Sequence, residues 1–323
     1  MRYGETGRDR FGECLFRPAG GANEVIFGKN DLTRRTKLLG AAFLIPALLL
    51  IGSTMVVPIG WNAVMSFTTW NGIGEMKPVG WSNYAVFFQD PVTLKGFYYS
   101  IFIAVVSSTI AVLTGLLLAL MIHRAGRKEG AFYRLVFFAP AMMPLVVIGL
   151  LFTFILSPDT GLVNHALRAI GLQSLERAWL AEPGTVLWTI AAIGGWRFSG
   201  FVMMLTYTAI VTLPASMFEA AKFEGMGYFR QVRMIILPLI MPTIRLVTML
   251  MLIISFKTYD IVWAMTQGGP GDFSRTVPVR MLDVAFRYNE FGYAAAISVM
   301  LTIVVSLVIA LSRKLTKGSV YEY

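Results

Sequence analysis

Apolar residues in this chain gather in six long runs separated by polar and charged segments. Each run approaches the ~20 mostly apolar residues that a helix needs to cross about 30 Å of hydrocarbon. Backbone inside lipid must satisfy its own hydrogen bonds, and the alternating strands of a membrane barrel do not occur, so the runs predict helices. The predicted spans are residues 38–58, 98–122, 135–156, 187–213, 243–265 and 293–312. The expected fold class is an all-α membrane protein.

The composition agrees with this pattern. Of the 323 residues, 56% are hydrophobic and 14% charged, and the mean hydropathy of +0.66 excludes an ordinary soluble domain. A net charge of +10 would suggest nucleic acid as the partner of a soluble protein. In a membrane protein, basic residues collect in cytoplasmic loops, so no nucleic-acid partner is expected. Cys14 is the only cysteine, which excludes an intrachain disulfide and a Cys-based metal cluster.

Lys and Arg also orient the chain. Nineteen of them lie near the two termini and in the second and fourth connections between spans, whereas seven lie in the other connections. The positive-inside bias therefore predicts that both termini and residues 214–242 are cytoplasmic and that residues 266–291 are outside. Residues 1–37 are polar and lack helical periodicity, so they are expected to form a cytoplasmic N-terminal extension. Residues 38–323 then form the six-helix domain.

Residues 219–242 form a charged amphipathic insert between the fourth and fifth apolar runs. Ser216, with Glu219 three residues later, predicts a capped helix start. Gly225 and Gly227 predict the end of that helix, and a second amphipathic segment follows. That segment is predicted to end at Pro238 and Pro242, where the fifth span begins. The expected product is a short helix-turn-helix at the cytoplasmic face.

This insert resembles the EAA loop of binding-protein-dependent ABC importer permeases, in which Glu-Ala-Ala, an acid-Gly pair and a later Leu-Pro dock a cytoplasmic ATPase. The matching positions are Glu219, Ala220, Ala221, Glu224, Gly225, Leu237, Pro238 and Pro242. Glu224 stands where the family most often has Asp, and Met226 stands where it has Ala. The resemblance implies ATPase-coupling roles for Glu219, Ala220, Ala221, Glu224, Gly225 and Pro238, with small side chains at Ala220 and Ala221 allowing close approach.

Further segments are similar to the carbohydrate-specific, maltose-permease-like members of that family. These segments are YDIVW (259–263) followed by TQGGP (266–270), FGYAA (291–295) and VGWSNYAVFFQDP (79–91). The resemblance covers the chain from about residue 38 to its end. It implies the six-helix fold of type I ABC importer permeases, in a bacterial or archaeal cytoplasmic (inner) membrane.

The resemblance also implies a set of partners for a sugar importer. These are a second homologous permease subunit, two cytoplasmic ABC ATPase subunits and an extracytoplasmic sugar-binding protein. The sequence contains no G-x-x-x-x-G-K-[ST] motif, so ATP and Mg are expected on the ATPase, and this chain is expected to bind no cofactor. No catalytic motif or metal-ligand cluster occurs, and a transport subunit rather than an enzyme is expected.

Charged residues inside the spans mark a candidate substrate cavity, because an intramembrane ionisable group usually faces a cavity or a partner. Arg197 and Lys257 lie at similar predicted depths, and Asp260 shares a helix face with Lys257 if the fifth span is continuous. One interpretation is an interhelical ion pair that neutralises itself. The other is a cavity lined by Trp196, Arg197, Lys257, Tyr259, Asp260 and Trp263, since sugars combine polar hydroxyls with an apolar face that stacks on aromatic rings.

Two alternatives to a neutral-sugar importer remain open at this stage. Arg197 and Lys257 against Asp260 leave one net positive charge, which suits an importer of acidic carbohydrate or sugar phosphate. An ion-coupled secondary transporter would need an uncompensated carboxylate in a span, for which Asp260 is the only candidate.

Overall fold

The computed structural model describes residues 29–125 and 127–315, so residues 1–28 of the predicted extension lie outside the described residues. The chain divides into two units, residues 1–59 and 60–323. In the first unit, helix α1 (Lys29–Ile51) begins inside the segment predicted as the extension and continues through a π-helical turn, η1 (Gly52–Val56), into α2 (Val57–Met65), which crosses the unit boundary.

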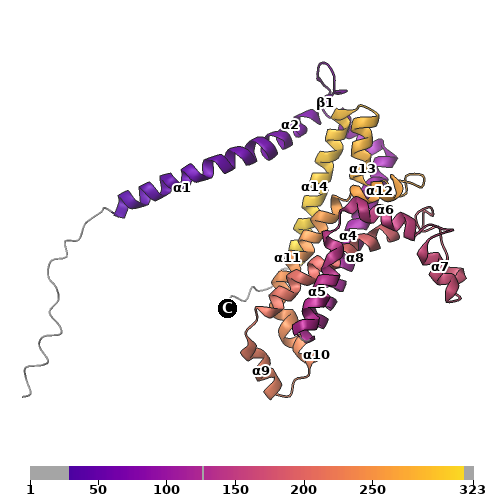
Figure 1. The fold of residues 1–323 in the computed structure, drawn as a ribbon. Coiled ribbons are helices and arrows are strands. Elements are labelled where there is room, and N and C mark those ends of the chain that lie inside the picture. The colour runs from indigo at the N-terminus through magenta and orange to yellow at the C-terminus, as the bar shows by residue number, and fades with distance from the viewer. Residues whose placement is uncertain (1–28, 126, 316–323) are drawn as a thin grey trace, which may run out of the picture. The chain divides into compact units, whose positions relative to one another are not determined.

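The second unit is a helical bundle (Figure 1). Its long helices are α4 (Pro91–Arg124), α5 (Arg127–Met142), α6 (Leu145–Ile155), α8 (Val186–Val211), α11 (Leu237–Phe256) and α14 (Phe291–Leu315). Short helices α3 (Ser82–Gln89), α7 (Leu162–Ala169), α9 (Ala215–Phe223), α10 (Tyr228–Gln231), α12 (Asp260–Thr266) and α13 (Val277–Leu282) connect them.

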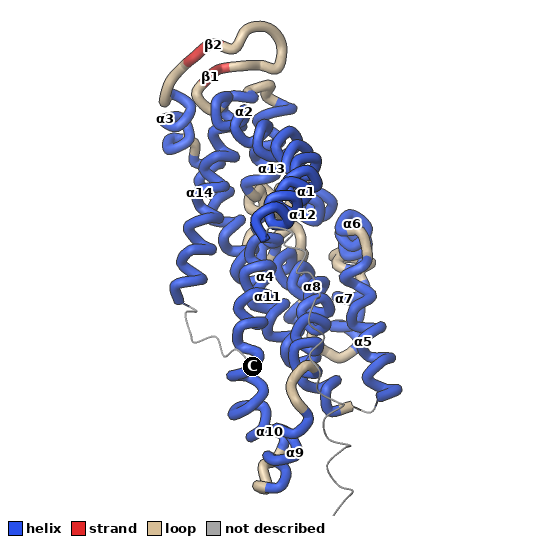
Figure 2. Tube along the Cα trace, turned by 90° about the vertical axis from the view of Figure 1, so that its left-hand side faces the viewer, coloured by secondary structure: helices blue, strands red, loops and turns tan. Residues whose placement is uncertain are grey.

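The remaining elements are the strands β1 (Thr68–Thr69) and β2 (Lys77–Pro78) and three short turns, η2 (Gln173–Leu175), η3 (Val232–Ile236) and η4 (Asp283–Arg287). The strands pair antiparallel, with Thr68 opposite Pro78. Figure 2 shows this hairpin at one end of the bundle and α9 and α10 at the other. Helix α13, within the segment 266–291 predicted to lie outside, is near the hairpin end, so this segment and the predicted cytoplasmic segment 214–242 occupy opposite ends.

Five helices in the described part of the chain are long and apolar enough to cross a membrane, and a sixth span results if α5 and α6 count as one. The α5–α6 pair is bent by 96° between Met142 and Leu145. Pro144 lies at this bend, and a proline has no N–H to continue a helical ladder. The six predicted spans are recovered in this form, with the third one broken.

The fifth span differs from its predicted range of 243–265. One helical segment runs from Tyr228 to Phe256, through the π-helical turn η3. Pro238 stands at the start of α11 and Pro242 within it, so the prediction that these prolines end the preceding segment is wrong. A π-helical turn just before Pro238 shifts the hydrogen-bond ladder and lets the chain continue past a residue that cannot donate.

The core of the bundle is the pairing of α4 with α8. Where these helices meet, Gly195 leaves room for Ile110, and a side chain added there would lie 2.6 Å from its Cβ. On the neighbouring face of α8, a Cβ at Gly200 would lie within contact distance of the Phe137 carbonyl of α5. The main chain of α8 therefore lies directly against both neighbours, which makes α8 the fixed centre of the bundle.

Candidate functional site

The first part of the candidate site is the coupling element, defined as α9, the turn after it and α10. Helix α9 begins at Ala215, and Pro214 occupies the N-cap position without a side-chain capping bond. Ser216 lies inside the helix, so the predicted Ser216–Glu219 capping box is wrong. A proline at that position already presets the backbone for a helix start, and α9 starts two residues earlier than a Ser216 cap would require.

The turn of the coupling element is a complete helix-ending motif centred on Gly225. Gly225 has φ of +72°, in the left-handed region that favours glycine. Its N–H donates to the Lys222 carbonyl at 2.9 Å, and the Met226 N–H donates to the Ala221 carbonyl at 2.9 Å. This pair of bonds is the Schellman arrangement. The predicted end of this helix at Gly225 is therefore confirmed.

The coupling element is fastened to the bundle on one side. The Tyr228 hydroxyl donates to the Leu120 carbonyl of α4 at 2.6 Å, and the His123 ring stacks on Tyr228. Below them, Val232 and Ile236 pack in one core cluster with Ile122 of α4. A displacement of α10 would therefore be transmitted directly to the end of α4.

The other side of the coupling element is open. Phe223 is 92% exposed and Phe229 80% exposed, the highest exposures among large apolar side chains of this element. Of the predicted coupling residues, Glu219, Ala220, Glu224, Gly225 and Pro238 are also exposed, whereas Ala221 is buried against its own chain. Sequence reasoning missed Phe223 and Phe229. Two aromatic residues within a polar connection are the signal that could have found them.

The second part of the candidate site is the break between α11 and α12. Lys257 caps the end of α11, and Asp260 starts α12, so the two residues do not share the face of one continuous helix. Neutral hydroxyls satisfy this break: Thr258 donates to the Ser255 carbonyl at 2.6 Å, and Thr276 donates to the Thr258 carbonyl at 3.2 Å. Both Lys257 and Asp260 are exposed here.

The aromatic residues predicted for the cavity group around the same break. Tyr259 stacks on Trp263 with ring centroids 5.8 Å apart, and the Arg287 guanidinium lies 5.0 Å from the Trp263 ring. Tyr259, Trp263 and Phe152 pack on one core cluster, and Phe152 makes an edge contact with Trp196 at 5.5 Å. Four of the six predicted residues thus lie at the α11–α12 break or on α12, and Trp196 joins them through Phe152.

Arg197 has different partners from those predicted. Among the ion pairs of the described residues, none joins Asp260 to Arg197 or to Lys257, so the ion-pair interpretation is wrong. One Nη of Arg197 instead donates to the carbonyls of Ala141 and Met143, at 3.3 and 3.1 Å. The guanidinium also lies 4.5 Å from the Phe198 ring.

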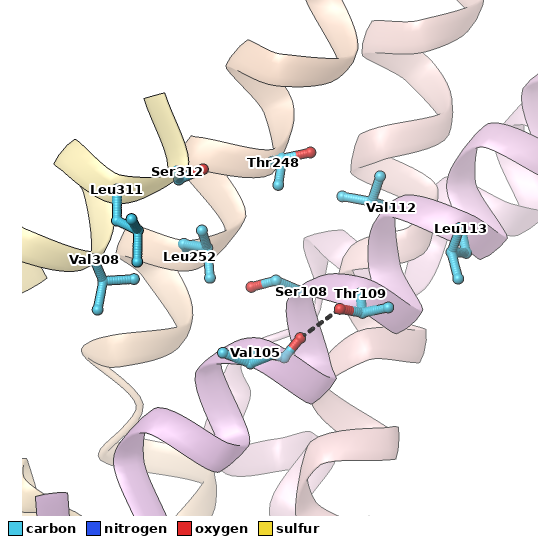
Figure 3. A pocket seen from close by; sticks show the side chains of 10 residues that line it. All are labelled: Val105, Ser108, Thr109, Val112, Leu113, Thr248, Leu252, Val308, Leu311 and Ser312. Atoms are coloured by element: carbon cyan, nitrogen blue, oxygen red, sulfur yellow. Dashed lines mark hydrogen bonds between the residues drawn. The ribbon is translucent and has the colours of Figure 1, made fainter. Parts of the chain in front are cut away.

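Three pockets help to place these residues. Trp196 lines one of about 460 Å³ between α4, α5 and α8, and Glu219 and Lys222 line another of about 440 Å³ between α9, α10 and the end of α4. A third, of about 380 Å³ between α4, α11 and α14, has an apolar wall with Thr109 hydrogen-bonded to Val105 (Figure 3). The third pocket contains none of the predicted site residues.

An outer polar cluster, defined as Asp90, Thr93, Arg280 and Tyr293, ties three helices together near the hairpin end. Asp90 caps α4, accepting from the N–H groups of Val92 and Thr93, and also accepts from Arg280 at 2.9 Å and from Tyr293 at 2.9 Å. Burial would raise the pKa of Asp90, but the hydrogen bonds from Thr93, Arg280 and Tyr293 outweigh it and hold that pKa well below its usual value.

Two of the four residues of this cluster, Asp90 and Tyr293, lie in segments that carry the family resemblance, but nothing in those segments predicted that they meet. Asp90 precedes Pro91, and an Asp followed by Pro is a recognised helix-start signal. Tyr293 belongs to the FGYAA segment. The structure therefore brings together two segments that are about 200 residues apart, since the Tyr293 hydroxyl donates to Asp90 across a separation of 203 residues.

Residues 111–317 match the model of the family described as "Binding-protein-dependent transport system inner membrane component". The chain is 32% identical to the probable ABC transporter permease protein YurN of Bacillus subtilis, over 87% of this chain and 96% of YurN. It is 30% identical to the diacetylchitobiose uptake system permease protein NgcF of Streptomyces coelicolor, over 82% of this chain and 79% of NgcF.

Among solved structures, a chain of a bacterial alginate ABC transporter in complex with alginate pentasaccharide-bound periplasmic protein has a TM-score of 0.76 to this chain. The two are 19% identical, over 90% of this chain and 98% of that chain. At this identity the likeness concerns the fold, and it extends over nearly the whole bundle.

Proposed function

Because the chain belongs to the family of binding-protein-dependent transport system inner membrane components, we propose that it is the permease subunit that moves a sugar through an ATP-driven importer. The sugar class is supported by relatives whose names refer to carbohydrate uptake, NgcF among them. It is also supported by the aromatic and polar residues at the α11–α12 break.

The observation that carries the proposal is the open side of the coupling element. Phe223 and Phe229 expose almost their whole rings, and a patch of this kind marks a surface that a partner covers. The proposed partner is a cytoplasmic ATPase, which binds and hydrolyses ATP with Mg, while this chain binds no cofactor. Movement of the coupling element then reaches α4 through the Tyr228–Leu120 hydrogen bond.

The proposed sugar path runs beside the α11–α12 break. Lys257, Tyr259 and Asp260 lie at the break, Trp263 follows on α12, and Trp196 and Arg197 lie on α8. A second homologous permease would supply the other wall of the path. An extracytoplasmic binding protein would deliver the sugar at the hairpin end, with both termini in the cytoplasm of a bacterial or archaeal cell.

An acidic sugar or sugar phosphate is the second candidate substrate class. Lys257 is exposed at the break, whereas Arg287, over the Trp263 ring at 5.0 Å, already pairs with Asp283 at 3.2 Å, so Lys257 is the cation that an anionic sugar would meet beside the proposed path. A matched pair of one neutral and one anionic sugar, offered to Lys257→Gln, separates the two classes. Selective loss of the anionic sugar would favour the second class.

The function is tested in proteoliposomes that contain the full transporter. Sugar uptake is expected to require ATP and the loaded binding protein, and Phe223→Ser with Phe229→Ser is expected to abolish both ATPase binding in pull-down and uptake. Phe88→Ser is the control, because Phe88 is 64% exposed on α3 near the other end of the bundle. Uptake driven by a proton or sodium gradient without ATP would refute the proposal in favour of a secondary transporter.

A further inference from the structure

The bend between α5 and α6 leaves backbone groups that need hydrogen-bond partners from elsewhere in the protein. A helix end leaves carbonyl groups without helical partners, and inside a membrane each such group must find a partner within the protein. Pro144 leaves one more carbonyl without a donor, because it occupies the N-cap position of α6 and has no N–H to donate back into α5. Some other donor has to reach the carbonyls at the bend.

Arg197 is that donor. Its guanidinium bonds the carbonyl of Ala141, in the last turn of α5, and the carbonyl of Met143, between the two helices. A positive charge is also favourable at the C-terminal end of a helix, where the helix dipole is negative. One cationic side chain therefore satisfies a carbonyl at the end of α5 and a carbonyl within the bend at once.

The helix that carries Arg197 is held in place on both sides. The main chain of α8 lies against α4 at Gly195 and against α5 at Gly200, three residues after Arg197. The α5 half of the bent pair is therefore fixed, and the angle at Met143 decides where the α6 half lies. Helix α6 in turn packs against α12, where a Cβ at Gly149 would lie 2.7 Å from Ala264.

We propose that Arg197 is a positioning residue: it holds the α5–α6 bend and thereby sets where α6 and α12 stand beside the sugar path. It acts through the backbone of the bend rather than by binding sugar. One Nη of Arg197 already bonds two carbonyls of the bend, and the Arg197 Nε is buried without a hydrogen-bond partner. The inference rests on the proposed function only for the transport readout.

Glutamine and methionine give the decisive comparison at this position. The two side chains are of similar size, and glutamine keeps two N–H donors without a charge, whereas methionine keeps none. If Arg197 serves the bend, Arg197→Gln should retain the bend and most of the uptake, and Arg197→Met should lose both. If Arg197 binds an anionic sugar or neutralises a carboxylate, both variants should fail alike.

The bend is measured directly by the distance between spin labels on Leu135→Cys of α5 and Phe154→Cys of α6. These two side chains are 69% and 76% exposed, and Cys14→Ser removes the native thiol. The assay uses the full transporter in lipid nanodiscs. Wild type and Arg197→Gln should give one narrow distribution, and Arg197→Met a broadened or displaced one.

Transport supplies the second readout. Arg197→Met should lower the maximal uptake rate about tenfold or more, the range expected for hydrogen bonds from a charged group, with the KM for loaded binding protein unchanged. Arg134→Met is the matched control, since Arg134 also joins α5 to α8, over the Tyr207 ring at 4.7 Å. It should leave the α5–α6 distance unchanged.

Two outcomes would overturn the proposal. The first is a narrow, wild-type distance in Arg197→Met. The second is equal loss of uptake in Arg197→Gln and Arg197→Met. If Arg197→Met cannot be recovered as folded protein, Arg197→Gln still decides, because a displaced distance in that variant contradicts a role carried by donors alone. The distance readout does not depend on the identity of the sugar, so failure of the proposed function leaves it interpretable.

Discussion

The two ends of the bundle differ in how far their polar and aromatic side chains are buried and paired within the chain. At the outer polar cluster, Asp90 accepts from two backbone N–H groups and three side chains, and its side chain and that of Arg280 are each 13% exposed. At the coupling element, Phe223 and Phe229 remain almost fully exposed. The groups of the outer cluster are satisfied within one chain, whereas Phe223 and Phe229 have no cover within it, and under the proposed function the ATPase supplies that cover.

This difference has a consequence for mutations. Where the chain satisfies its own groups, a substitution leaves a partner unpaired and lowers the free energy of unfolding. Where the chain leaves its groups exposed, a substitution changes stability little and changes the affinity for the partner. Stability measurements and binding measurements should therefore respond to different ends of the same bundle.

The largest expected effect is at Asp90. Asp90→Asn keeps a capping oxygen but removes the charge that pairs with the buried Arg280, so the free energy of unfolding should fall by about 3 kcal/mol. Thermal unfolding in detergent measures this. Asp272→Asn is the control, because Asp272 pairs with Arg275 at a 39% exposed position and should change stability by less than about 1 kcal/mol. Equal effects of the two variants would contradict the conclusion that the groups of the outer polar cluster satisfy one another within the chain.

Acid should weaken the same end. The pKa of Asp90 is lowered in the folded protein below its ordinary value of 3.8, so its stabilising contribution is complete above that value. The contribution is lost as the pH falls below it toward the folded-state pKa. The melting temperature should therefore drop between about pH 4 and about pH 2, and Asp90→Asn should show a smaller drop. Identical slopes in the two proteins would assign the acid sensitivity to other groups.

The coupling end offers a smaller, local effect at its turn. Gly225→Ala should destabilise the α9–α10 turn by about 1–2 kcal/mol, because an L-residue is strained at a positive φ. Space does not limit this change, since no atom lies within 4 Å of the added Cβ. Gly227→Ala is the matched control: its surroundings are equally open and its φ of −66° suits any residue. The hydrogen-exchange rates of residues 221–228 and the rate of ATP-driven uptake should change in Gly225→Ala. Both should keep their wild-type values in Gly227→Ala.

Much of this architecture could be predicted from the apolar runs and from resemblance. The family prediction is confirmed by the match over residues 111–317, and the helix break at Gly225 follows from local chemistry that a sequence displays. The six spans were predictable because hydrocarbon thickness fixes the length of an apolar run. The roles of all the coupling residues, Gly225 included, and of the sugar-path residues stay predictions.

The failures within the spans share one physical cause, which is that hydropathy reports the length of a span and not the hydrogen-bond partners of its backbone. It did not show that a π-helical turn carries the fifth span past Pro238, or that the span stops at Phe256. It also placed Arg197 opposite a carboxylate, because a buried charge suggests a charged partner. The actual partners are main-chain carbonyls at a bend, and carbonyls have no signature in a sequence.

The smallest expected change in stability comes from a test of whether the two ends lie on opposite sides of the membrane. Single cysteines at Glu75, in the hairpin loop, and at Glu224, beside the Gly225 turn, replace exposed side chains in a Cys14→Ser background. Such surface changes should alter the free energy of unfolding by no more than about 0.5 kcal/mol. Ser274 would be a poor choice although it lies in the predicted outer segment, since it is fully buried.

Because Lys and Arg favour a cytoplasmic coupling end, an impermeant maleimide should label Glu75→Cys in intact cells and Glu224→Cys only after permeabilisation. The reverse pattern would place the coupling element outside, away from ATP, and would leave Phe223 and Phe229 without the proposed ATPase as their partner.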